Sequence, residues 1–533
     1  MMNRKRQMMR EDSLLSSKRV DRRTVLKGGL AMGAMMLTDA ASAVQGTKSS
    51  SDAVDTTEPL NILMIVVDQE RGWYWLPDTL PFEEYMPARA WLRSQGVYFK
   101  NYHVHTNPCS PSRSTILTGR HTSGTRIFEN INVPVQGSMS PSIPTIGGIL
   151  SAGLGYYTAY IGKWHLTKDA DFIVDSNGLP SLESYGFRDW GGADFEGIAG
   201  TEGLDHDGEL CDQAITWLNN HRDDTTPWCL TVCLINPHDI AAYPSVTVNA
   251  PDYGLELPRN HWDSLATKPT AQIYWQKFYN YFKGRIPAED SDTWRLLLNN
   301  YLYYHIQVDI QINRILSALD SDLLARTVVV FTSDHGELGG AHMLRAKGPT
   351  VYRESQNVPL IVIDPRLTAE NRGIETVALA GGIDLAPTLV EIAGGKPSSF
   401  NLKGRSLMPI LSRENPADAP LRAVREGILF TYDAWQGSPT LRSQGHLRGI
   451  YNGQYKFARY YAVGHINDPL SEQQLELYDI NGFRADGHDE LKNRAYDPEY
   501  EDVVTEMNAL MGAMIEDEDA QGDQYEDLAK RAR

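Results

Sequence analysis

The segment 60–67 is an almost unbroken apolar run with several β-branched residues, and it ends at Asp68. A strand buried on both faces of a parallel sheet has this composition. Similar runs occupy 158–161, 230–235, 328–332 and 360–363, and helical stretches such as 209–221 and 294–319 lie between them. Strands that alternate with helices predict an α/β fold with a large, mostly parallel sheet between helices.

A different pattern begins after about residue 415. Short strand-like runs at 427–431, 447–451, 455–460 and 474–478 are joined by turns, and a helical stretch follows at 499–515. These features predict a small antiparallel sheet with a helix packed on it. We therefore expect a large domain at 59–415 and a C-terminal α+β subdomain with its tail at 416–533. The acidic stretch 516–533 is interpreted as a solvated tail or a polar helix.

The first 43 residues have the features of an export signal. Basic residues include the pair Arg22-Arg23, a short apolar stretch follows at 28–37, and Ala41-Ser42-Ala43 supplies small residues for cleavage. We interpret 1–43 as a bacterial twin-arginine signal peptide and 44–58 as a linker. The apolar stretch is too short for a stable membrane anchor. We expect recognition by the twin-arginine translocase and a periplasmic or secreted mature protein.

The charge balance is strongly acidic. The chain has 50 Lys and Arg against 68 Asp and Glu, a formal net charge of −18. Without the nine basic and four acidic residues of 1–43, the net charge becomes −23. A surface this acidic disfavours nucleic acid as a partner. An anionic substrate would need a local basic pocket set against this field.

The four cysteines do not form a recognised metal or disulfide framework. Cys229 and Cys233 share one face of a strand-like run and are interpreted as buried hydrophobes. The cysteine spacing fits no structural zinc pattern. A disulfide that involves Cys211 is possible, and nothing in the sequence supports it. A chain that folds in the reducing cytoplasm before export depends less on disulfides.

The stretch 109–120 contains the most informative motif, Cys-Ser-Pro-Ser-Arg followed by Leu-Thr-Gly-Arg. Pro111 suits the first turn of a helix, which would place Cys109 at the helix N-terminus. Free backbone N–H groups and Arg113 would then attract an anion. The local physics therefore predicts an anion site with a thiol at its mouth, and the alternative is a buried cysteine that begins an ordinary helix.

This motif resembles the signature of the type I sulfatases, members of the alkaline phosphatase superfamily. The resemblance runs from about Pro59 to about Tyr496 and implies an alkaline-phosphatase-like fold. It implies that a maturation enzyme oxidises Cys109 to formylglycine (3-oxoalanine), whose hydrate is the nucleophile. It also implies that Arg113 stabilises this nucleophile.

Two pairs of polar residues, each of which begins with an aspartate, follow predicted strands. They are Asp68-Gln69 and Asp334-His335. Ligands in α/β sheets gather beyond the carboxyl ends of strands, so these side chains could converge on a divalent metal. Either pair alone is more often a turn or a helix cap. By resemblance, Asp68, Gln69, Asp334, His335 and the modified Cys109 hold one divalent metal that polarises sulfate and nucleophile.

The metal pairs depart from the commonest pattern of the family, Asp-Asp and Asp-Asn. Gln69 and His335 replace two of those side chains. The family favours calcium, which prefers oxygen ligands, whereas an imidazole nitrogen suits manganese or another transition metal better. Related phosphonate and phosphate ester hydrolases carry similar substitutions, so the metal and the strict sulfate preference both stay open.

Further residues complete the resemblance. Lys163 and His165 lie in Gly-Lys-Trp-His, His238 in Asn-Pro-His-Asp, and Lys347 in Arg-Ala-Lys-Gly. The resemblance implies that Lys163, His238 and Lys347 bind sulfate and that His165 assists the aldehyde hydrate. It also implies that His238 and Lys347 protonate the leaving oxygen. A lone Lys or His would usually be a solvated or satisfied side chain.

These features predict hydrolysis of a small-molecule or carbohydrate sulfate monoester. A phosphonate or phosphate ester hydrolase on the same scaffold is the first alternative. A non-catalytic binding protein with an unconverted Cys109 is the second. Loops decide which ester is bound, and we expect the segment 241–288 to be one of these loops.

Overall fold

The computed structural model describes residues 59–176, 178–191, 194–195, 200–434, 446–481 and 489–521. The predicted signal at 1–43 and linker at 44–58 lie outside these residues, as do residues 522–533 of the predicted tail. The division at residue 415 stays a prediction.

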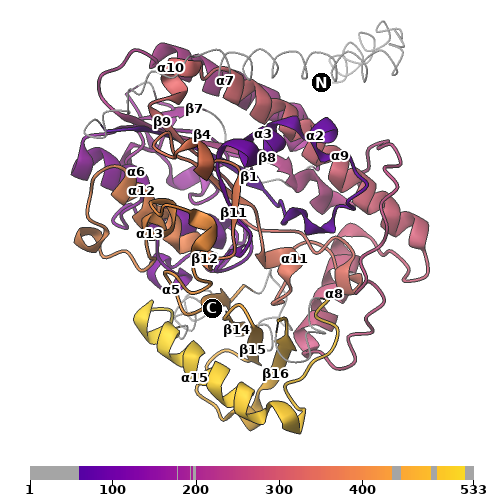
Figure 1. Cartoon of the computed structure of the whole chain (residues 1–533). Coiled ribbons are helices and arrows are strands. Elements are labelled where there is room, and N and C mark those ends of the chain that lie inside the picture. The colour runs from indigo at the N-terminus through magenta and orange to yellow at the C-terminus, as the bar shows by residue number, and fades with distance from the viewer. Residues whose placement is uncertain are drawn as a thin grey trace, which may run out of the picture. The chain divides into compact units, whose positions relative to one another are not determined.

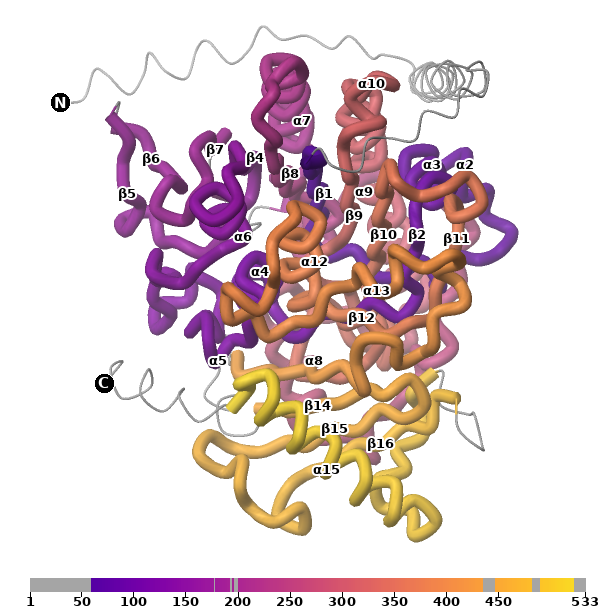
Figure 2. The backbone as a smooth tube through the Cα atoms, turned by 60° about the vertical axis from the view of Figure 1, so that its left-hand side comes forward, coloured from indigo at the N-terminus to yellow at the C-terminus, as the bar shows by residue number. Residues whose placement is uncertain are grey.

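The main sheet has eight strands in the order β11-β2-β10-β9-β1-β8-β4-β7. At its centre, β1 (Asn61–Asp68) pairs in parallel with both β8 (Trp228–Pro237) and β9 (Thr327–Ser333). Only β10 (Leu360–Ile363) runs antiparallel to its neighbours within this sheet. The other strands are β2 (Val97–Phe99), β4 (Tyr157–Gly162), β7 (Asp189–Gly191) and β11 (Ile374–Thr376). Figure 2 shows the sheet between its helices.

The two faces of β1 pack against different helices, because successive side chains of a strand point to opposite sides. Ile62, Met64 and Val66 share a core with residues of α4 (Cys109–Thr118) and α12 (Leu385–Ile392). Leu63, Ile65 and Val67 pack instead with residues of the three helices on the other face. Those helices are α3 (Pro87–Gln95), α7 (Glu202–Asn220) and α9 (Ser291–Ser317). The unbroken apolar run of β1 is therefore buried on both faces. Figure 1 shows α7 and α9 on one side of the strands and α12 on the other.

Shorter elements connect these layers. They are α2 (Phe82–Tyr85), α5 (Thr122–Thr125), α6 (Ile146–Gly148), α8 (Thr270–Lys283), α10 (Ser321–Leu324), α11 (Arg353–Gln356), α13 (Met408–Leu411), β3 (Tyr102–His103), β5 (Ile173–Val174), β6 (Pro180–Ser181) and β12 (Ala380–Gly381). The segment 241–288, predicted as a loop, thus contains the helix α8.

The C-terminal part forms an antiparallel sheet of β13 (Ile428–Tyr432), β14 (His446–Tyr451), β15 (Tyr455–Tyr461) and β16 (Gln474–Asp479). Met507 and Met511 of α15 (Glu501–Asp517) pack on one face of it. Phe430 and Tyr460, from its other face, join the core of the main sheet. The predicted fold class, a large mostly parallel sheet with a smaller antiparallel sheet and helix, is confirmed.

The stretch after α15 is partly buried where the structure describes it, because Glu518 and Ala520 are buried whereas Asp519 and Gln521 are exposed. Glu518 is fully buried, with its Oε2 2.7 Å from Nε2 of His121. Its Oε1 accepts hydrogen bonds from Arg405 at 3.0 Å and Arg425 at 3.3 Å. The beginning of the acidic stretch therefore ties the C-terminal helix to the main core.

All four cysteines are buried and free, so Cys211 does not form the disulfide that the sequence left undecided. Cys229 and Cys233 lie in one core cluster, as their spacing on β8 predicted. Among the described residues, no helix is both long enough and apolar enough to cross a membrane.

The substitution Glu518→Gln is expected to destabilise the fold by about 3 kcal/mol, because it leaves buried guanidinium and imidazole groups without their carboxylate. Burial would raise the pKa of Glu518, but Arg425 and His121 hold it well below the usual range. This stabilisation is therefore present above about pH 4.3 and lost as the pH falls further. Thermal unfolding at pH 7 and pH 3 measures both effects.

The matched control is Asp517→Asn, because the Asp517 side chain is 61% exposed and pairs with Arg405. An exposed ion pair contributes about 0–1 kcal/mol. Equal unfolding temperatures for the Glu518 variant and the wild-type protein at pH 7 would show that Glu518 does not hold the C-terminal helix on the main core.

Candidate active site

The predicted site residues gather at the carboxyl edge of the main sheet. Asp68 is the last residue of β1, and Asp334 directly follows β9 on the neighbouring strand. Lys163 follows β4, and His238 follows β8. Parallel strands end at the same edge, so one end of the sheet collects these side chains from distant parts of the sequence.

Cys109 is the first residue of α4, as the motif predicted. Pro111 fits the first turn because backbone N–H groups there have no helical partner to lose. The Cys109 Sγ lies 3.1 Å from Nε2 of His335 and 3.8 Å from Oδ1 of Asp68. The helix N-terminus therefore brings the thiol to the carboxyl edge of the sheet.

Arg113, one turn further along α4, joins the two carboxylates. Its Nη2 lies 2.9 Å from Asp68 Oδ2, and its Nε lies 3.0 Å from Asp334 Oδ2. Its Nη1 donates to the backbone carbonyl of Lys163 at 2.7 Å. The Lys163 Nζ lies 2.8 Å from Asp68 Oδ2. Two buried cations therefore balance two buried anions at the centre of the site.

The donor set fits a divalent cation. Ligand atoms of Asp68, Cys109, Asp334 and His335 all lie within 4.8 Å of one another. His335 Nδ1 lies 3.0 Å from the carbonyl of Gly336, which leaves Nε2 facing the other ligands. A histidine bound to metal commonly has this outer partner. Burial lowers the pKa of His335 to about 4, so its ring is neutral and can offer a lone pair.

The two carboxylates repel each other. Burial, together with the charge of Asp68, raises the pKa of Asp334 to about 6. Burial would also raise the pKa of Asp68, but Lys163 and Arg113 hold it well below the usual range. A bound cation would relieve this repulsion, which is a physical reason for one to bind between them.

The Gln69 side chain also forms hydrogen bonds outside the carboxylate cluster. Its Oε1 accepts a hydrogen bond from Lys347, and its Nε2 donates to Glu337 Oε2 at 2.5 Å. Glu337 also accepts from the backbone N–H groups of Gly339 at 2.8 Å and Ala346 at 2.6 Å. Sequence reasoning gave Glu337 no role, although the glycines around it mark the loop that it holds in place.

His165 is held in an unfavourable backbone conformation, with a φ of 58°. Its N–H donates to the Asp194 carboxylate at 2.8 Å and 2.9 Å, and Trp164 N–H donates to the same group at 3.0 Å. Both ring nitrogens of His165 are buried and have no protein partner among the described residues. Burial and the charge of Lys163 lower its pKa, so the ring is neutral. No sequence signal pointed to Asp194.

His238 and Lys347 are the least buried of the predicted site residues. They are 6% and 7% exposed, whereas the other predicted site residues are at most 2% exposed. The His238 Nε2 lies 3.9 Å from Asp68 Oδ1. Burial and the charge of Lys347 lower the pKa of His238. The site is therefore least covered at these two residues.

Other clusters are less suited to a cation. The groups His105–His121–Glu518 and His342–Glu354–Glu490 also bring ligand atoms together. Each of them has three ligand residues, however, one fewer than the cluster at Cys109. The cluster at Cys109 remains the best candidate metal site among the described residues.

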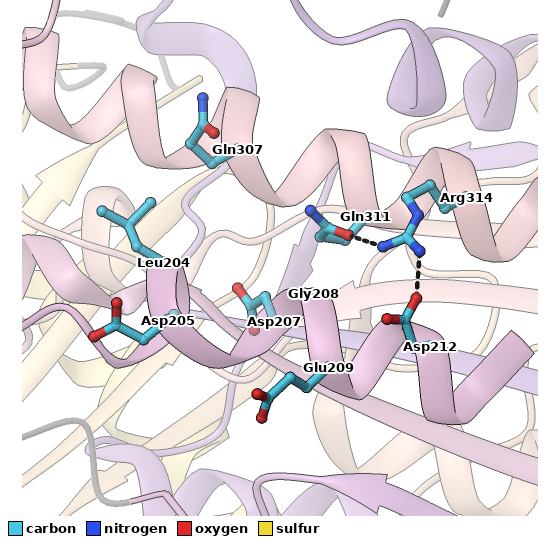
Figure 3. A pocket seen from close by; sticks show the side chains of 10 residues that line it. Leu204, Asp205, Asp207, Gly208, Glu209, Asp212, Gln307, Gln311 and Arg314 are labelled. Atoms are coloured by element: carbon cyan, nitrogen blue, oxygen red, sulfur yellow. Dashed lines mark hydrogen bonds and ion pairs between the residues drawn. The ribbon is translucent and has the colours of Figure 1, made fainter. Parts of the chain in front are cut away.

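A hollow of about 270 Å³ lies between α7 and α9 (Figure 3). Its wall includes Asp207, whose carboxylate accepts from the backbone N–H groups of Ile235 at 2.6 Å and Asn236 at 3.0 Å. The carboxylate of Asp239 accepts hydrogen bonds from the backbone N–H groups of Gly203 and Leu204 at the start of α7. This second bond pair explains why α7 begins at Glu202, before the predicted 209. The two carboxylates fix the chain on both sides of His238.

Comparison with known families identifies the chain. A model of the sulfatase family matches residues 60–395, and a model of the N-sulphoglucosamine sulphohydrolase C-terminal region matches residues 341–517. The protein therefore belongs to the sulfatase family, a family of sulfuric ester hydrolases. The family membership that the sequence motifs predicted is confirmed.

Two curated relatives illustrate the range of the family. The uncharacterized sulfatase YidJ of Escherichia coli (strain K12) is 29% identical over 332 residues, which cover 57% of this chain and 61% of that protein. This chain thus spans less than two thirds of its length. The Delta 4,5-hexuronate-2-O-sulfatase of Bacteroides thetaiotaomicron is 25% identical over 461 residues, or 82% of this chain and 83% of that protein.

Solved structures share the fold. A 2-O GAG sulfatase has a TM-score of 0.67 at 22% identity, with 88% of this chain and 94% of that chain covered. A phosphonate monoester hydrolase from Silicibacter pomeroyi has a TM-score of 0.66 at 21% identity, with 87% and 96% covered. At these identities the likeness establishes architecture, and the fold alone does not separate sulfur from phosphorus esters.

The substitution Asp207→Ala is expected to lower stability by about 3 kcal/mol, because it leaves two buried N–H groups before His238 without an acceptor. Asp212→Ala on the same helix is the control, since its exposed pairing with Arg314 contributes about 0–1 kcal/mol. Urea unfolding compares the two variants. Equal unfolding midpoints would show that Asp207 does not hold the end of β8.

Proposed function

We propose that the protein hydrolyses a sulfate monoester and releases inorganic sulfate and an alcohol. The observation that carries this proposal is the set of cations around Cys109, namely Arg113, Lys163 and Lys347, in a chain with a net charge of −18. Membership of the sulfatase family supports it. The site is the local basic pocket that an anionic substrate of so acidic a protein requires.

Cys109 is proposed to be converted to formylglycine by a maturation enzyme. The hydrated aldehyde would supply an oxygen nucleophile with a second hydroxyl, which an ordinary serine lacks. The position of Cys109 at the N-terminus of α4 supports this role, because backbone N–H groups there stabilise negative charge. Arg113 adds a guanidinium that is fixed on both of its sides by Asp68 and Asp334.

One divalent metal is proposed to be held by Asp68, Gln69, Asp334 and His335, beside residue 109. Such an ion would polarise the sulfate oxygens and the nucleophile. Calcium is the metal expected from the family, and the neutral imidazole of His335 favours manganese or another transition metal as the alternative. Gln69 would have to share its Oε1 between the ion and Lys347.

The remaining residues bind the anion and move protons. Lys163 and Lys347 would neutralise the sulfate oxygens within a preorganised site. His165 has a neutral ring with unpartnered nitrogens and would accept a proton beside residue 109. A bound sulfate would offset the Lys347 charge that lowers the pKa of His238, so the ring would gain a proton for the leaving oxygen.

The substrate is proposed to be a small-molecule or carbohydrate sulfate ester. The hexuronate and GAG sulfatases among the similar proteins support a carbohydrate. The features of residues 1–43 support export through the twin-arginine translocase to a periplasmic or extracellular location.

Parallel rate measurements on 4-nitrophenyl sulfate and 4-nitrophenyl phenylphosphonate test the proposal. We expect kcat/KM to be at least tenfold higher for the sulfate, and Lys163→Ala to lower it by a factor of about 100, since it removes a buried cation from the site. Lys396→Ala, a control at an exposed lysine outside the site, should leave the rates unchanged. Faster turnover of the phosphonate would favour the phosphorus ester hydrolase instead.

Metal content of the purified protein tests the ligand set. We expect one divalent ion per chain by elemental analysis, and loss of at least ten-fold in affinity in His335→Ala, because an imidazole donor is removed. The control His206→Ala changes a half-exposed histidine on α7 and should keep the ion. Full metal content in the His335 variant would remove this residue from the proposed site.

A further inference from the structure

One face of α8 packs against the segments that carry His238 and Lys347. Tyr279 and Lys283 lie four residues apart, so both are on this face. The Tyr279 hydroxyl donates to the carbonyl of Ala241 at 2.5 Å, in the 3-10 helix that begins with His238. The guanidinium of Arg345, two residues before Lys347, lies 5.0 Å from the centre of the Tyr279 ring. This face therefore packs against the segments that carry His238 and Lys347, the two least buried residues of the site.

Further contacts fix α8 to the loop that carries Lys347. The Trp275 Nε1 donates to the Arg345 carbonyl at 3.0 Å. Arg345 Nη2 in turn donates to the carbonyl of Gly284, directly after Lys283, at 2.6 Å. A Cβ on Gly348 would meet the Trp275 ring at 2.5 Å, so helix and loop are in close contact. The position of Lys283 relative to Lys347 is thus set by packed elements.

Lys283 is half-buried, and its carbonyl accepts from the Ser245 hydroxyl at 2.8 Å. Among the described residues, no carboxylate lies within ion-pair distance of its ammonium group. Burial and the charge of Lys347 lower its pKa. A half-buried cation without a carboxylate partner costs free energy, and an anion bound by Lys283 beside the loop that carries Lys347 would offset that cost.

We propose that Lys283 binds a second anionic group of the substrate, a carboxylate or a second sulfate, while the reacting sulfate ester lies at Lys347 and Cys109. The substrate class is then a sulfated sugar that carries at least two negative charges. This inference rests on the proposed sulfatase function. It adds a specificity-determining residue to that site.

A simpler role for Lys283 predicts something different. A lysine in the last turn of a helix interacts favourably with the helix dipole. That role alone would change stability and leave substrate preference untouched, so the test must measure preference.

The test compares two matched pairs of sulfate esters. One pair is a hexuronic acid 2-O-sulfate and its methyl ester, and the other is glucosamine-2-N,6-O-disulfate and N-acetylglucosamine-6-O-sulfate. 4-Nitrophenyl sulfate, which has no second charge, is the reference substrate. The variants are Lys283→Ala, Lys283→Arg and, as a control on the same helix, Lys277→Ala.

We expect the wild-type protein to prefer the more charged member of one pair at least tenfold in kcat/KM. The pair that shows the preference distinguishes a carboxylate from a second sulfate. Lys283→Ala should reduce the preference below threefold through KM, whereas Lys283→Arg and Lys277→Ala should keep it. Rates on 4-nitrophenyl sulfate should not change. Equal use of both members by the wild-type protein, or an undiminished preference in Lys283→Ala, would overturn the proposal.

The failure of the proposed function is detected separately. If the wild-type protein cleaves none of these esters, calorimetric titration with the same four sugars measures binding instead. A tenfold tighter Kd for the more charged sugar that is lost in Lys283→Ala would still support the anion site. Equal Kd values for both members of each pair would refute it.

Discussion

The geometry of the site depends on the bridge that Arg113 forms between Asp68 and Asp334. Two carboxylates at the ends of neighbouring parallel strands would repel each other strongly if they were buried alone. The guanidinium binds one with Nη2 and the other with Nε, and it holds the Lys163 carbonyl with Nη1. One side chain therefore connects β1, β9, the end of β4 and α4, and it places Cys109 beside both carboxylates.

The same bridge explains how an acidic protein can attract an anion. Arg113 and Lys163 pair with Asp68 and Asp334, whereas the ammonium group of Lys347 donates to the neutral amide of Gln69 and has no carboxylate within ion-pair distance among the described residues. The histidines at 165, 238 and 335 are neutral because burial lowers their pKa values. A metal ion would leave the pocket clearly positive although the whole chain has a net charge of −18. Buried local charge, screened little by solvent, outweighs the distant surface charge.

Much of the fold could be predicted because its signals are local. The apolar run before Asp68 identified β1, and the Cys-Ser-Pro-Ser-Arg motif placed Cys109 at the start of a helix. The supporting residues carry no such signal. Asp194, Asp207 and Glu518 act through backbone or side-chain partners up to 397 residues away, and only the folded chain shows those pairs. The start of α7 was misplaced for the same reason, because Asp239 stabilises it from another element. Gln69 was expected to bind the metal. Its hydrogen bonds to Lys347 and Glu337 could not be predicted, because the loop that carries those residues lies far away in the sequence.

The central claim is that residue 109 acts as an oxygen nucleophile rather than as a thiol. A mass spectrum of the tryptic peptide 101–113, from active protein purified from its native host, tests this claim most directly. The account predicts that the Cys109 side chain has lost its sulfur and carries an aldehyde or its hydrate. An unmodified thiol in protein that hydrolyses sulfate esters would contradict it.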